Sequence, residues 1–516
     1  MLMVKCFFFH TVLFGLLLTG PKIHAQTPYP FSPKLDRSQG SVSSLPPSNS
    51  VSHIAVRDSS ILWIGSSKGL ARTFSGGRSW EAFRSNPAFG SNGIFAVAVR
   101  GDTAWASTGF TQEIEDDRVQ TGSGYAFSLD NGVIWTHRPQ TLDAANDSIL
   151  QYGANRIRIV PIVVEEQNVT FDIDLSDSLV WIASWASSLR KSSDLGQTWQ
   201  RVVLPNDLRS SISPNDTLDG YIVDPRQNNN FLAFSVFVQN DSTIWAGSAG
   251  GINKSTDRGV SWTRFTTTNQ AAPILGNWVI AISGQQIDTS YRLWVTNWVA
   301  GENEQFGVSY TDDGGRIWKN FLHGIRAYAF AFKGSIAYVA TEEGVYRTSD
   351  AGRSWTRSGT IVDQNSGEQV TSLAVFAVGV IGDTVYCATG DGIAKTIDNA
   401  ANPFGQTWEV IRTYQPLPSP ASTYAYPNPF SPDDEIVRIH YSTGGVPASV
   451  TIEILDFGMN RVRTVVKDAP RSGPGERDEI WDGRDDSNTQ VANGVYFYRV
   501  VINDGEPVWG KVMVLQ

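Results

Sequence analysis

The sequence has few cysteines, few histidines and no long run of basic residues. Its 516 residues include two cysteines and six histidines, and the formal net charge is -10. A chain with this charge and no Lys/Arg-rich run is poorly suited to nucleic acid or to anionic membranes. It contains no phosphate loop, no nucleophile elbow and no Rossmann fingerprint, and no two of its histidines stand at metal-ligand spacing. The sequence therefore predicts no metal, no cofactor and no nucleic-acid partner.

Long apolar runs are also scarce. The run 7–18 follows a basic start and precedes Ala25, a small residue suited to cleavage. We predict a signal peptide over residues 1–25, and no transmembrane segment after its removal. Only Cys387 then remains, so the mature chain cannot form an internal disulfide. Cys387 lies in a strand-like run and is predicted to be a buried core residue, with a reactive nucleophile as the alternative.

A sustained 3.6-residue apolar period is absent as well, which argues against helices. Short runs rich in β-branched and aromatic residues alternate instead with Gly, Asp, Asn and Ser turns, a pattern typical of strands. One such run with a central Trp or Tyr occurs seven times, as in 62–65 and 244–247. Another β-rich run precedes most of these, as in 94–99, 231–238 and 278–282. Each repeat unit is predicted to contain four strands, A to D.

The repeat Ser/Thr-x-Asp-x-Gly-x-x-Trp, called the Asp motif below, also occurs seven times. It is intact at 128–135, 192–199, 255–262, 311–318 and 348–355. The copy 73–80 has Ser75 in place of the Asp, and 396–408 carries five extra residues before its Gly. As a C–D turn, the Asp can accept turn N–H groups, the Gly can supply a positive φ, and the Trp can wedge against the next blade. The predicted structural residues are Asp130, Asp194, Asp257, Asp313, Asp350, Asp398, Trp80, Trp135, Trp199, Trp262, Trp318, Trp355 and Trp408.

Seven four-stranded units indicate a seven-bladed β-propeller over residues 51–413. The Asp motifs resemble the Asp-box (BNR-like) repeats of sialidases, sortilin-type receptors, xyloglucan hydrolases and photosystem assembly factors. This resemblance implies that the Asp motifs lie on the face away from any active site. The aspartates of the motifs are therefore interpreted as structural, and no catalytic residue is assigned to them.

The flanking segments differ in composition from the repeats. Residues 26–50 are rich in Pro, Ser and Gln and are expected to be a flexible lead-in or a strap lying over the domain, and 414–424 a Pro/Ser linker. Alternating runs in 425–516 predict a small Ig-like β-sandwich, so the whole chain is all-β. The segments YPNPF, WDGRD and GVYFYRV resemble the FlgD-like Ig domain of flagellar hook-capping proteins and the C-terminal domains that address proteins to type IX secretion. The resemblance implies a role in export or anchoring, with the type IX machinery as a partner.

Long insertions at 108–124, 137–153, 202–230 and 298–306 are expected to be loops on the face opposite the Asp motifs. Trp185 and Trp298 each stand at the start of a loop between strands B and C, on the same face. With Phe110 they are candidates for a platform that stacks on a sugar ring or a peptide side chain, the alternative being that they pack inward. The acidic residues Glu113, Asp116 and Asp117 are further candidates for ligand binding, the alternative being a solvated acidic loop.

An enzyme would need other features. A glycosidase requires two carboxylates that flank a cleft, and six acidic side chains are available, namely Glu113, Glu115, Asp116, Asp117, Glu302 and Glu304. A sialidase requires an arginine cluster, for which Arg156 and Arg158 are the nearest approach, but they alternate in a strand. The run 172–177 has the Asp spacing of a calcium loop but lacks its Gly and final Glu, so a turn is expected there.

Three functions follow from these patterns. The leading one is a secreted or cell-surface bacterial protein, exported through the periplasm, that binds a polysaccharide or protein on its loop-decorated face without catalysis. The alternative is an extracellular glycoside hydrolase of the Asp-box propeller type. The third, an assembly factor for a membrane complex, is disfavoured by the C-terminal sandwich, because such factors end at the propeller.

Overall fold

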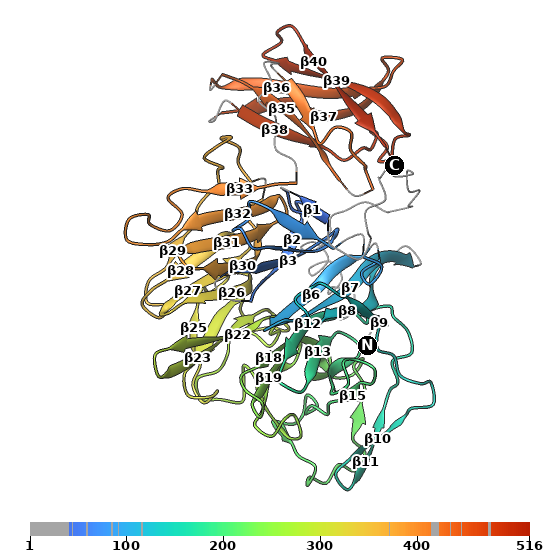
Figure 1. The fold of residues 1–516 in the computed structure, drawn as a ribbon, viewed down its shortest axis with the longest axis vertical. Helices are drawn as coiled ribbons and strands as arrows, with labels where there is room; N and C mark the ends of the chain where they lie inside the picture. The colour runs from blue at the N-terminus through green and yellow to red at the C-terminus, as the bar shows by residue number, and fades with distance from the viewer. Residues whose placement is uncertain are drawn as a thin grey trace. The chain divides into compact units, whose positions relative to one another are not determined.

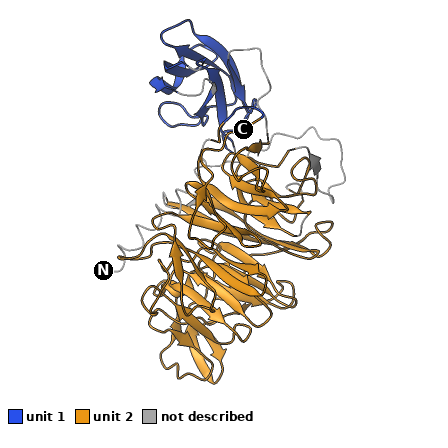
Figure 2. Ribbon diagram, turned by 90° about the vertical axis from the view of Figure 1, so that its left-hand side faces the viewer, with its two compact units in different colours: residues 1–35, 365–368, 414–516 blue, residues 36–364, 369–413 orange. Residues whose placement is uncertain are grey.

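The computed structural model describes residues 41–43, 45–57, 60–83, 86–90, 92–114, 117–370, 372–413, 423–433, 435–444, 446–472 and 476–515. They form two compact units, shown in Figure 2. One contains residues 365–368 and the described residues from 423 onward, and the other contains the rest. The predicted signal peptide lies outside the described residues. So do residues 26–40 of the lead-in and most of the linker.

The larger unit contains seven antiparallel sheets that follow one another along the chain (Figure 1), and we number these blades 1 to 7. Blade 1 consists of β2 (Val51–Val56), β3 (Leu62–Ser66), β4 (Gly69–Thr73) and β5 (Trp80–Ala82), with β1 (Ser41–Ser43) outside β5. Blade 2 consists of β6 (Gly93–Arg100), β7 (Thr103–Ile114), β8 (Asp117–Ser128) and β9 (Thr136–Arg138). Blade 3 consists of β12 (Thr170–Leu175), β13 (Val180–Ser184), β14 (Ser188–Ser192) and β15 (Gln200–Arg201).

The remaining blades repeat this order. Blade 4 consists of β18 (Ala233–Val238), β19 (Ile244–Ser248), β20 (Gly251–Ser255) and β21 (Trp262–Phe265), with β16 (Ser211–Ile212) outside β21. Blade 5 consists of β22 (Ile282–Ile287), β23 (Ser290–Asn297), β24 (Gly307–Thr311) and β25 (Lys319–Phe321). Blade 6 consists of β26 (Ala327–Lys333), β27 (Ile336–Thr341), β28 (Gly344–Thr348) and β29 (Thr356–Arg357). Blade 7 consists of β30 (Val375–Ile381), β31 (Thr384–Thr389), β32 (Gly392–Ile397) and β33 (Glu409–Ile411).

The first strand of each blade contacts the first strand of the next. The contacts run from β2 to β6, β12, β18, β22, β26 and β30, and β30 contacts β2 again, so the seven sheets close into a ring. The structure thus confirms the all-β propeller fold with seven blades. The first and last segments of the propeller are also hydrogen-bonded to each other. The Asn49 carbonyl accepts the Gly392 N–H at 2.7 Å, and the Asn49 side chain accepts the Thr413 N–H at 2.6 Å.

Blades pack through the Trp residues that the repeats supply. The side chains of β3, β13 and β19 are buried along their whole length, because each of these second strands lies inside its sheet and between two blades. Gly259 of the blade 4 Asp motif lies against the ring of Trp181 in blade 3, where a Cβ would come within 2.5 Å of the indole. The Gly therefore serves close packing between blades as well as its positive φ of 75°.

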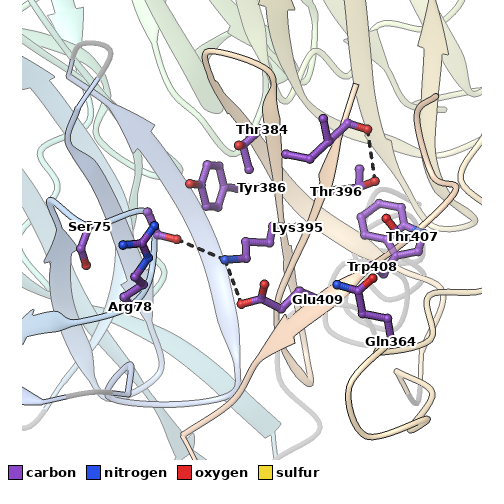
Figure 3. Close-up of a pocket in the computed structure, with 12 residues that line it drawn as sticks. Ser75, Arg78, Gln364, Thr384, Tyr386, Lys395, Thr396, Thr407, Trp408 and Glu409 are labelled. Atoms are coloured by element: carbon purple, nitrogen blue, oxygen red, sulfur yellow. Dashed lines mark hydrogen bonds and ion pairs between the residues drawn. The ribbon is translucent and has the colours of Figure 1, made fainter. Parts of the chain in front are cut away.

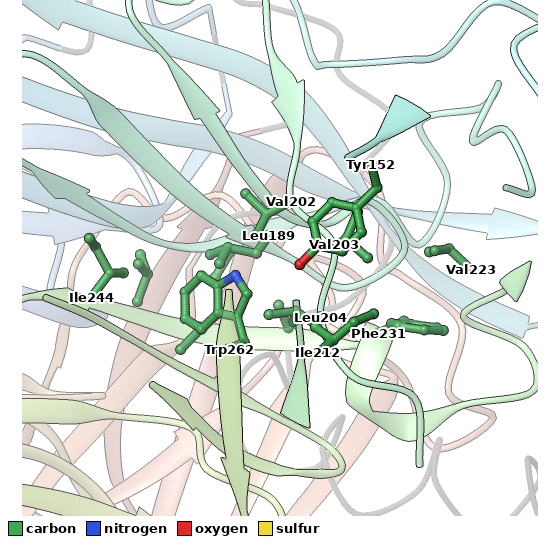
Figure 4. Close-up of a cluster of buried hydrophobic side chains, with 14 of the residues drawn as sticks. Tyr152, Leu189, Val202, Val203, Leu204, Ile212, Val223, Phe231, Ile244 and Trp262 are labelled. Atoms are coloured by element: carbon green, nitrogen blue, oxygen red, sulfur yellow. The ribbon is translucent and has the colours of Figure 1, made fainter. Parts of the chain in front are cut away.

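A further sheet covers the junction of blades 3 and 4. The strands β10 (Ile149–Tyr152), β11 (Asn155–Ile159) and β17 (Ile222–Val223) form it in the order β10-β11-β17. Its apolar side chains join Leu189, Val202 and Trp262 in one buried cluster, shown in Figure 4. Tyr152 of this sheet donates to the carbonyl of Val260, which lies inside the blade 4 Asp motif, at 2.7 Å. The predicted loops 137–153 and 202–230 therefore contain strands that reach the Asp-motif side of the junction.

Two predicted segments differ in the structure. The expected loop 108–124 is a long hairpin, because β7 and β8 stay paired from Ala104–Ser128 to Ile114–Asp117. We call the first strand of each blade its inner strand. The inner strand of blade 5, β22, begins at Ile282, four residues after the predicted start at Trp278. Upstream of it the backbone turns toward blade 4, since the Val279 N–H donates to the carbonyl of Ser248 at 3.1 Å.

The run 172–177 is also different from its prediction. Asp172 and Asp174 do not form a turn but lie in β12, the inner strand of blade 3. Asp172 accepts the backbone N–H of Val236 at 2.9 Å, and Asp174 accepts that of Val238 at 2.6 Å. Both donor N–H groups lie across the junction on β18, so the two carboxylates join the inner strands of blades 3 and 4.

The smaller unit contains two sheets. One has β34 (Thr423–Tyr426), β35 (Val437–Ser442) and β38 (Glu476–Trp481), in the order β34-β35-β38. The other has β36 (Ala448–Leu455), β37 (Arg461–Arg471), β39 (Gly494–Ile502) and β40 (Val508–Val514), in the order β37-β36-β39-β40. Val450, Ile452 and Ile454 alternate with exposed or partly buried positions in β36 and share one buried cluster with Phe430 and Trp481. This arrangement is the predicted β-sandwich.

The described part of the chain contains no α-helix. It holds a single short 3₁₀ turn, η1 (Asn229–Phe231), just before β18. None of its helices has the length and apolar character needed to cross a bilayer.

Candidate functional site

The two faces of the propeller carry different segments. In each blade the antiparallel pairing puts the turn between the second and third strands at one end and the Asp motif at the other. We call these ends the loop face and the motif face. The first residues of each inner strand pair with the last residues of the second strand, as Ala233 does with Ser248, and therefore lie at the loop face.

The inner strands share a bulge at this end. The register shifts by one residue near the start of six of the seven inner strands, with β22 as the exception in the described propeller. In five of the six the bulged residue is aromatic, and these residues are Phe95, Phe171, Phe234, Tyr328 and Phe376. A bulge re-aims the side chain it carries. The repeat therefore places aromatic rings in equivalent positions around the loop-face end of the inner strands.

Four aromatic residues from blades 3 to 5 meet there. The ring centroid of Phe234 lies 5.2 Å from that of Trp185, 5.9 Å from Phe171 and 5.7 Å from Trp278. Phe234 is buried, whereas the other three are partly exposed. We call Phe171, Trp185, Phe234 and Trp278 the loop-face aromatic cluster. A second group continues beyond it, with Tyr328 5.8 Å from both Trp298 and Phe376.

The three predicted platform residues do not lie together. Trp185 belongs to the loop-face aromatic cluster. Trp298 is only 2% exposed and donates its indole N–H to the carbonyl of Ala327 at 2.9 Å, so it packs inward and offers no open ring face. Phe110 is 39% exposed on β7. Trp185 has Phe234 as its ring neighbour instead, and Phe234 in turn contacts Trp278. The sequence places both of these residues in predicted strands but does not single them out.

The predicted acidic residues are dispersed. Glu115 and Asp116 lie outside the described residues, as does the side chain of Glu113, and Asp117 is exposed at the start of β8. Glu304 accepts the backbone N–H of Asn277 at 3.1 Å and that of Ala300 at 2.6 Å, so this carboxylate holds its own loop together.

The aspartates of the intact Asp motifs are committed to their turns. Asp257 accepts the N–H of Val260 at 3.1 Å and that of Ser261 at 2.9 Å, while Ser255 donates to it at 2.7 Å. Hydrogen bonds from the hydroxyl and the backbone of Thr198 lower the pKa of Asp194 to about 2. Carboxylates held ionised by their own turns are unsuited to proton transfer near neutral pH.

The blade 7 copy behaves differently. Asp398 accepts hydrogen bonds from the side chains of Tyr338 and Arg347, both on blade 6. The five extra residues separate Asp398 from the rest of its turn, and its carboxylate binds the neighbouring blade instead. The sequence predicted that Asp398 would accept the N–H groups of its own turn, and the structure shows contacts with blade 6 instead.

The motif face carries two hollows at equivalent junctions. One, of about 250 Å³, lies between blades 7 and 1 and is shown in Figure 3. There Lys395 donates to the carbonyl of Gly76 at 3.5 Å and pairs with Glu409 at 2.8 Å. The other, of about 400 Å³, lies between blades 4 and 5, where Lys254 donates to the carbonyl of Gly314 at 3.0 Å. Sequence analysis did not predict either hollow.

One group in the smaller unit has metal-ligand residue types. Ligand atoms of Glu368, His440 and Asp478 lie within 4.8 Å of one another. The group already has hydrogen bonds, because Tyr426 donates to Glu368 at 3.0 Å and the His440 Nδ1 lies 3.1 Å from the Asp478 carboxylate. Histidine spacing in the sequence gave no signal for it, because the three residues come from three distant segments.

Cys387 is fully buried on β31, and burial raises the pKa of its thiol well above the ordinary value. A thiol that stays protonated is a poor nucleophile. The residue packs with Val385, Val378 and Tyr338 in a core cluster, which is the predicted structural role.

Comparison with known proteins gives distant structural likenesses only. No family model and no curated protein matches the chain. Among solved structures it is similar to PorZ, a surface component of the type-IX secretion system of Porphyromonas gingivalis, with 14% identity, a TM-score of 0.35 and coverage of 90% of this chain and 66% of that one. It is also similar to an ancestral GH74 enzyme, with 15% identity, a TM-score of 0.47 and coverage of 90% of this chain and 60% of that one. The structure of YCF48 bound to D1 peptide has 14% identity to this chain, a TM-score of 0.43 and coverage of 71% of this chain and 99% of that one.

The chain spans less than two thirds of the PorZ and GH74 structures. Identities of 14–15% and TM-scores below 0.5 carry no information on function. The neighbours include a surface component and an enzyme, so they leave open whether this chain catalyses a reaction. The propeller assignment rests on the seven sheets and their closed ring in this chain itself.

Proposed function

We propose that this chain is a non-catalytic binding protein of the cell surface or the extracellular space that holds a polysaccharide on the loop face of its propeller. The observation that carries the proposal is the loop-face aromatic cluster. Three partly exposed rings, Phe171 and Trp185 of blade 3 and Trp278 just before blade 5, surround the buried ring of Phe234.

The chemistry of the cluster favours a sugar. Apolar faces of sugar rings pack on flat aromatic side chains, and binding sites combine such surfaces with a few polar groups. Asn277 stands next to Trp278, and its side chain is held by Glu304 and Thr267. Trp278 therefore stands on a hydrogen-bonded loop, which limits the conformational entropy lost on binding.

A glycan array followed by calorimetry tests this proposal. Trp185→Ala and Trp278→Ala should each weaken binding of the best polysaccharide about two- to tenfold, since one aromatic contact contributes about 0.5–1.5 kcal/mol. Phe110→Ala is the matched control, because Phe110 is exposed on blade 2 but makes no ring contact with the cluster within the described residues. No glycan binding by the wild-type chain, or equal effects of all three substitutions, would overturn the proposal. Release of reducing ends from the bound polysaccharide would assign the hydrolase alternative instead.

We further propose that the C-terminal sandwich serves export or surface anchoring, with the type IX machinery as partner. What supports this is the likeness of YPNPF, WDGRD and GVYFYRV to such domains, together with a compact unit that has its own hydrophobic core. Deletion of 425–516 should leave the propeller folded but absent from the cell surface. Equal surface display of the deleted and full chains would contradict this role.

A further inference from the structure

The two motif-face hollows share a sequence cause. The fourth residue of the Asp motif is Asn131, Leu195, Arg258 or Ala351 in four copies, but it is Gly76 in blade 1 and Gly314 in blade 5. A Cβ on Gly314 would come within 2.8 Å of the Lys254 Nζ, and one on Gly76 within 3.1 Å of the Tyr386 hydroxyl. Both of these atoms belong to residues that line the hollows. A glycine at this position therefore leaves space that a side chain would occupy.

The hollow between blades 4 and 5 is lined by two cations and no carboxylate. Lys254 and Arg316 line it together with the hydroxyl residues Ser211, Ser213, Thr256, Ser261 and Thr263. The guanidinium of Arg316 forms no hydrogen bond or ion pair with any described residue. This positive lining occurs in a protein whose formal net charge is -10.

The carboxylates near this hollow are already engaged. Asp257 and Asp313 accept the N–H groups of their own turns, at 2.9 Å from Ser261 and 2.9 Å from Arg316. Asp312 pairs with Lys319 at 2.8 Å. None of them forms an ion pair with Lys254 or with the Arg316 guanidinium in the described part of the chain.

The two cations also oppose each other. Burial, followed by repulsion from Arg316, lowers the pKa of Lys254 below its ordinary value, with Asp313 opposing the shift. Lys254 uses one N–H for the Gly314 carbonyl and lies 4.8 Å from the Trp245 ring centroid, so two further N–H groups remain for another acceptor. An anion between Lys254 and Arg316 would relieve their repulsion.

The size of the hollow indicates more than a bare ion. About 400 Å³ lies within the range of ~300–1,000 Å³ typical of small-molecule sites. Phe265 and Ile212 supply apolar walls, and the hydroxyl groups supply donors and acceptors. A ligand with one anionic group and several hydroxyl groups fits this lining.

The hollow between blades 7 and 1 provides a natural comparison. Lys395 there is equivalent to Lys254, and Arg78 to Arg316. The cross-strand partner of Lys395 is Glu409, whereas that of Lys254 is Thr263. Glu409 pairs with Lys395 at 2.8 Å and so neutralises the lysine that stays available in the other hollow.

We propose that the hollow between blades 4 and 5 binds a phosphate or sulfate ester of a sugar, with Lys254 and Arg316 holding the oxyanion. Arg316 supplies a planar set of donors that matches an oxyanion, and Lys254 supplies a point charge at its side. This site is separate from the loop-face aromatic cluster, and it does not depend on the proposed polysaccharide function.

Calorimetry of the full chain at low ionic strength with glucose 6-phosphate, glucose 6-sulfate and glucose tests the site. The wild-type chain should bind one or both esters and not glucose, and the two esters identify which oxyanion is preferred. Arg316→Ala should weaken ester binding at least tenfold. Thr263→Glu should weaken it to a similar extent, because it copies the neutralised hollow between blades 7 and 1.

The reciprocal variant makes the test independent of damage to the fold. Glu409→Thr should create a second site for the ester with unchanged melting temperature, since it frees Lys395 in the equivalent hollow. Trp185→Ala should bind the ester as tightly as wild type. The proposal is wrong if the wild-type chain binds neither ester, or if Arg316→Ala and Thr263→Glu leave the affinity unchanged.

Discussion

Trp245 of blade 4 and Trp318 of blade 5 meet edge to face, with ring centroids 6.4 Å apart and ring planes at 84°. The same pair joins other blades, as Trp63 with Trp135 at 6.0 Å and Trp294 with Trp355 at 6.3 Å. One ring in each pair comes from a second strand and the other from the Asp motif of the next blade. The two repeated aromatic signals of the sequence are thus the two halves of one contact between blades.

This contact predicts a large loss of stability on substitution. Trp318 is 3% exposed, and Trp318→Ala should lower the free energy of unfolding by about 3–5 kcal/mol, because it removes the contact with Trp245 and leaves a cavity between blades. Urea denaturation measures the effect. Ile317→Ala is the control, since Ile317 is 52% exposed in the same turn and its loss should change stability by less than about 0.5 kcal/mol.

The degenerate motif of blade 1 predicts a stabilising substitution. Ser75 accepts the N–H of Ser79 at 2.9 Å, whereas Asp257 in blade 4 accepts two turn N–H groups and the hydroxyl of Ser255. Ser75→Asp should raise the free energy of unfolding by about 1 kcal/mol through the added hydrogen bonds to a charged acceptor. Asp257→Ser should lower it, and a urea midpoint that moves the same way in both variants would contradict the argument.

The motif aspartates predict a loss of stability in acid. Asp194 and Asp350 both have their pKa lowered to about 2, chiefly by hydrogen bonds from Thr198 and Ser354. Unfolded aspartate titrates near ~3.9, so the contribution is fully present above that pH and is lost as the pH falls toward 2. The melting-temperature gap between the wild type and Asp194→Asn should therefore close from about pH 5 to pH 2. A gap that stays constant over this range would refute the prediction.

The two aspartates in the inner strand of blade 3 predict the opposite dependence of stability on pH. Burial raises the pKa of Asp172 to about 8 and that of Asp174 to about 6, against the hydrogen bonds from Val236 and Val238. Because the folded chain holds these protons more tightly than the unfolded one, stability from these groups is present below about pH 4 and is lost as the pH rises toward 8.

The substitution Asp172→Ala tests this predicted loss of stability with rising pH. Three other inner strands carry alanine at the equivalent position, after the bulge, namely Ala96, Ala329 and Ala377. The variant should show a smaller decline in melting temperature between pH 4 and pH 8 than the wild type. An equal or steeper decline would show that Asp172 is ionised throughout and held so by the backbone N–H groups of Val236 and Ile173.

The two candidate tryptophans predict separable effects. Trp298→Ala should lower the free energy of unfolding by about 3–5 kcal/mol, because the ring is buried and its N–H bonds to Ala327. Trp185 is partly exposed, so Trp185→Ala should cost less stability and act mainly on ligand binding. Urea denaturation beside glycan binding distinguishes the two, and a larger stability loss for Trp185→Ala would reverse the assignment.

The repeats in the sequence determined the strand content, the number of blades and the place of the Asp motifs as turns. These features follow from local patterns, since a Gly, an Asp and a Trp at fixed spacing constrain one turn wherever it occurs. Because these patterns are local, they do not predict contacts between side chains that lie far apart in the sequence. Glu409 and Thr263 look alike as strand residues beside a Trp, yet one neutralises a lysine and the other leaves it available.

Only the tertiary structure decided which side chains meet. Phe234 and Trp278 stand 44 residues apart in the sequence but have ring centroids 5.7 Å apart, because the backbone upstream of β22 turns toward blade 4. Asp172 and Asp174 have the spacing of a loop, but the ring of blades places them opposite free backbone N–H groups of the next inner strand, and they become part of a strand. The sequence by itself determined a repeated unit, whereas the closure of seven units into a ring determined which surfaces are buried and which remain for a ligand.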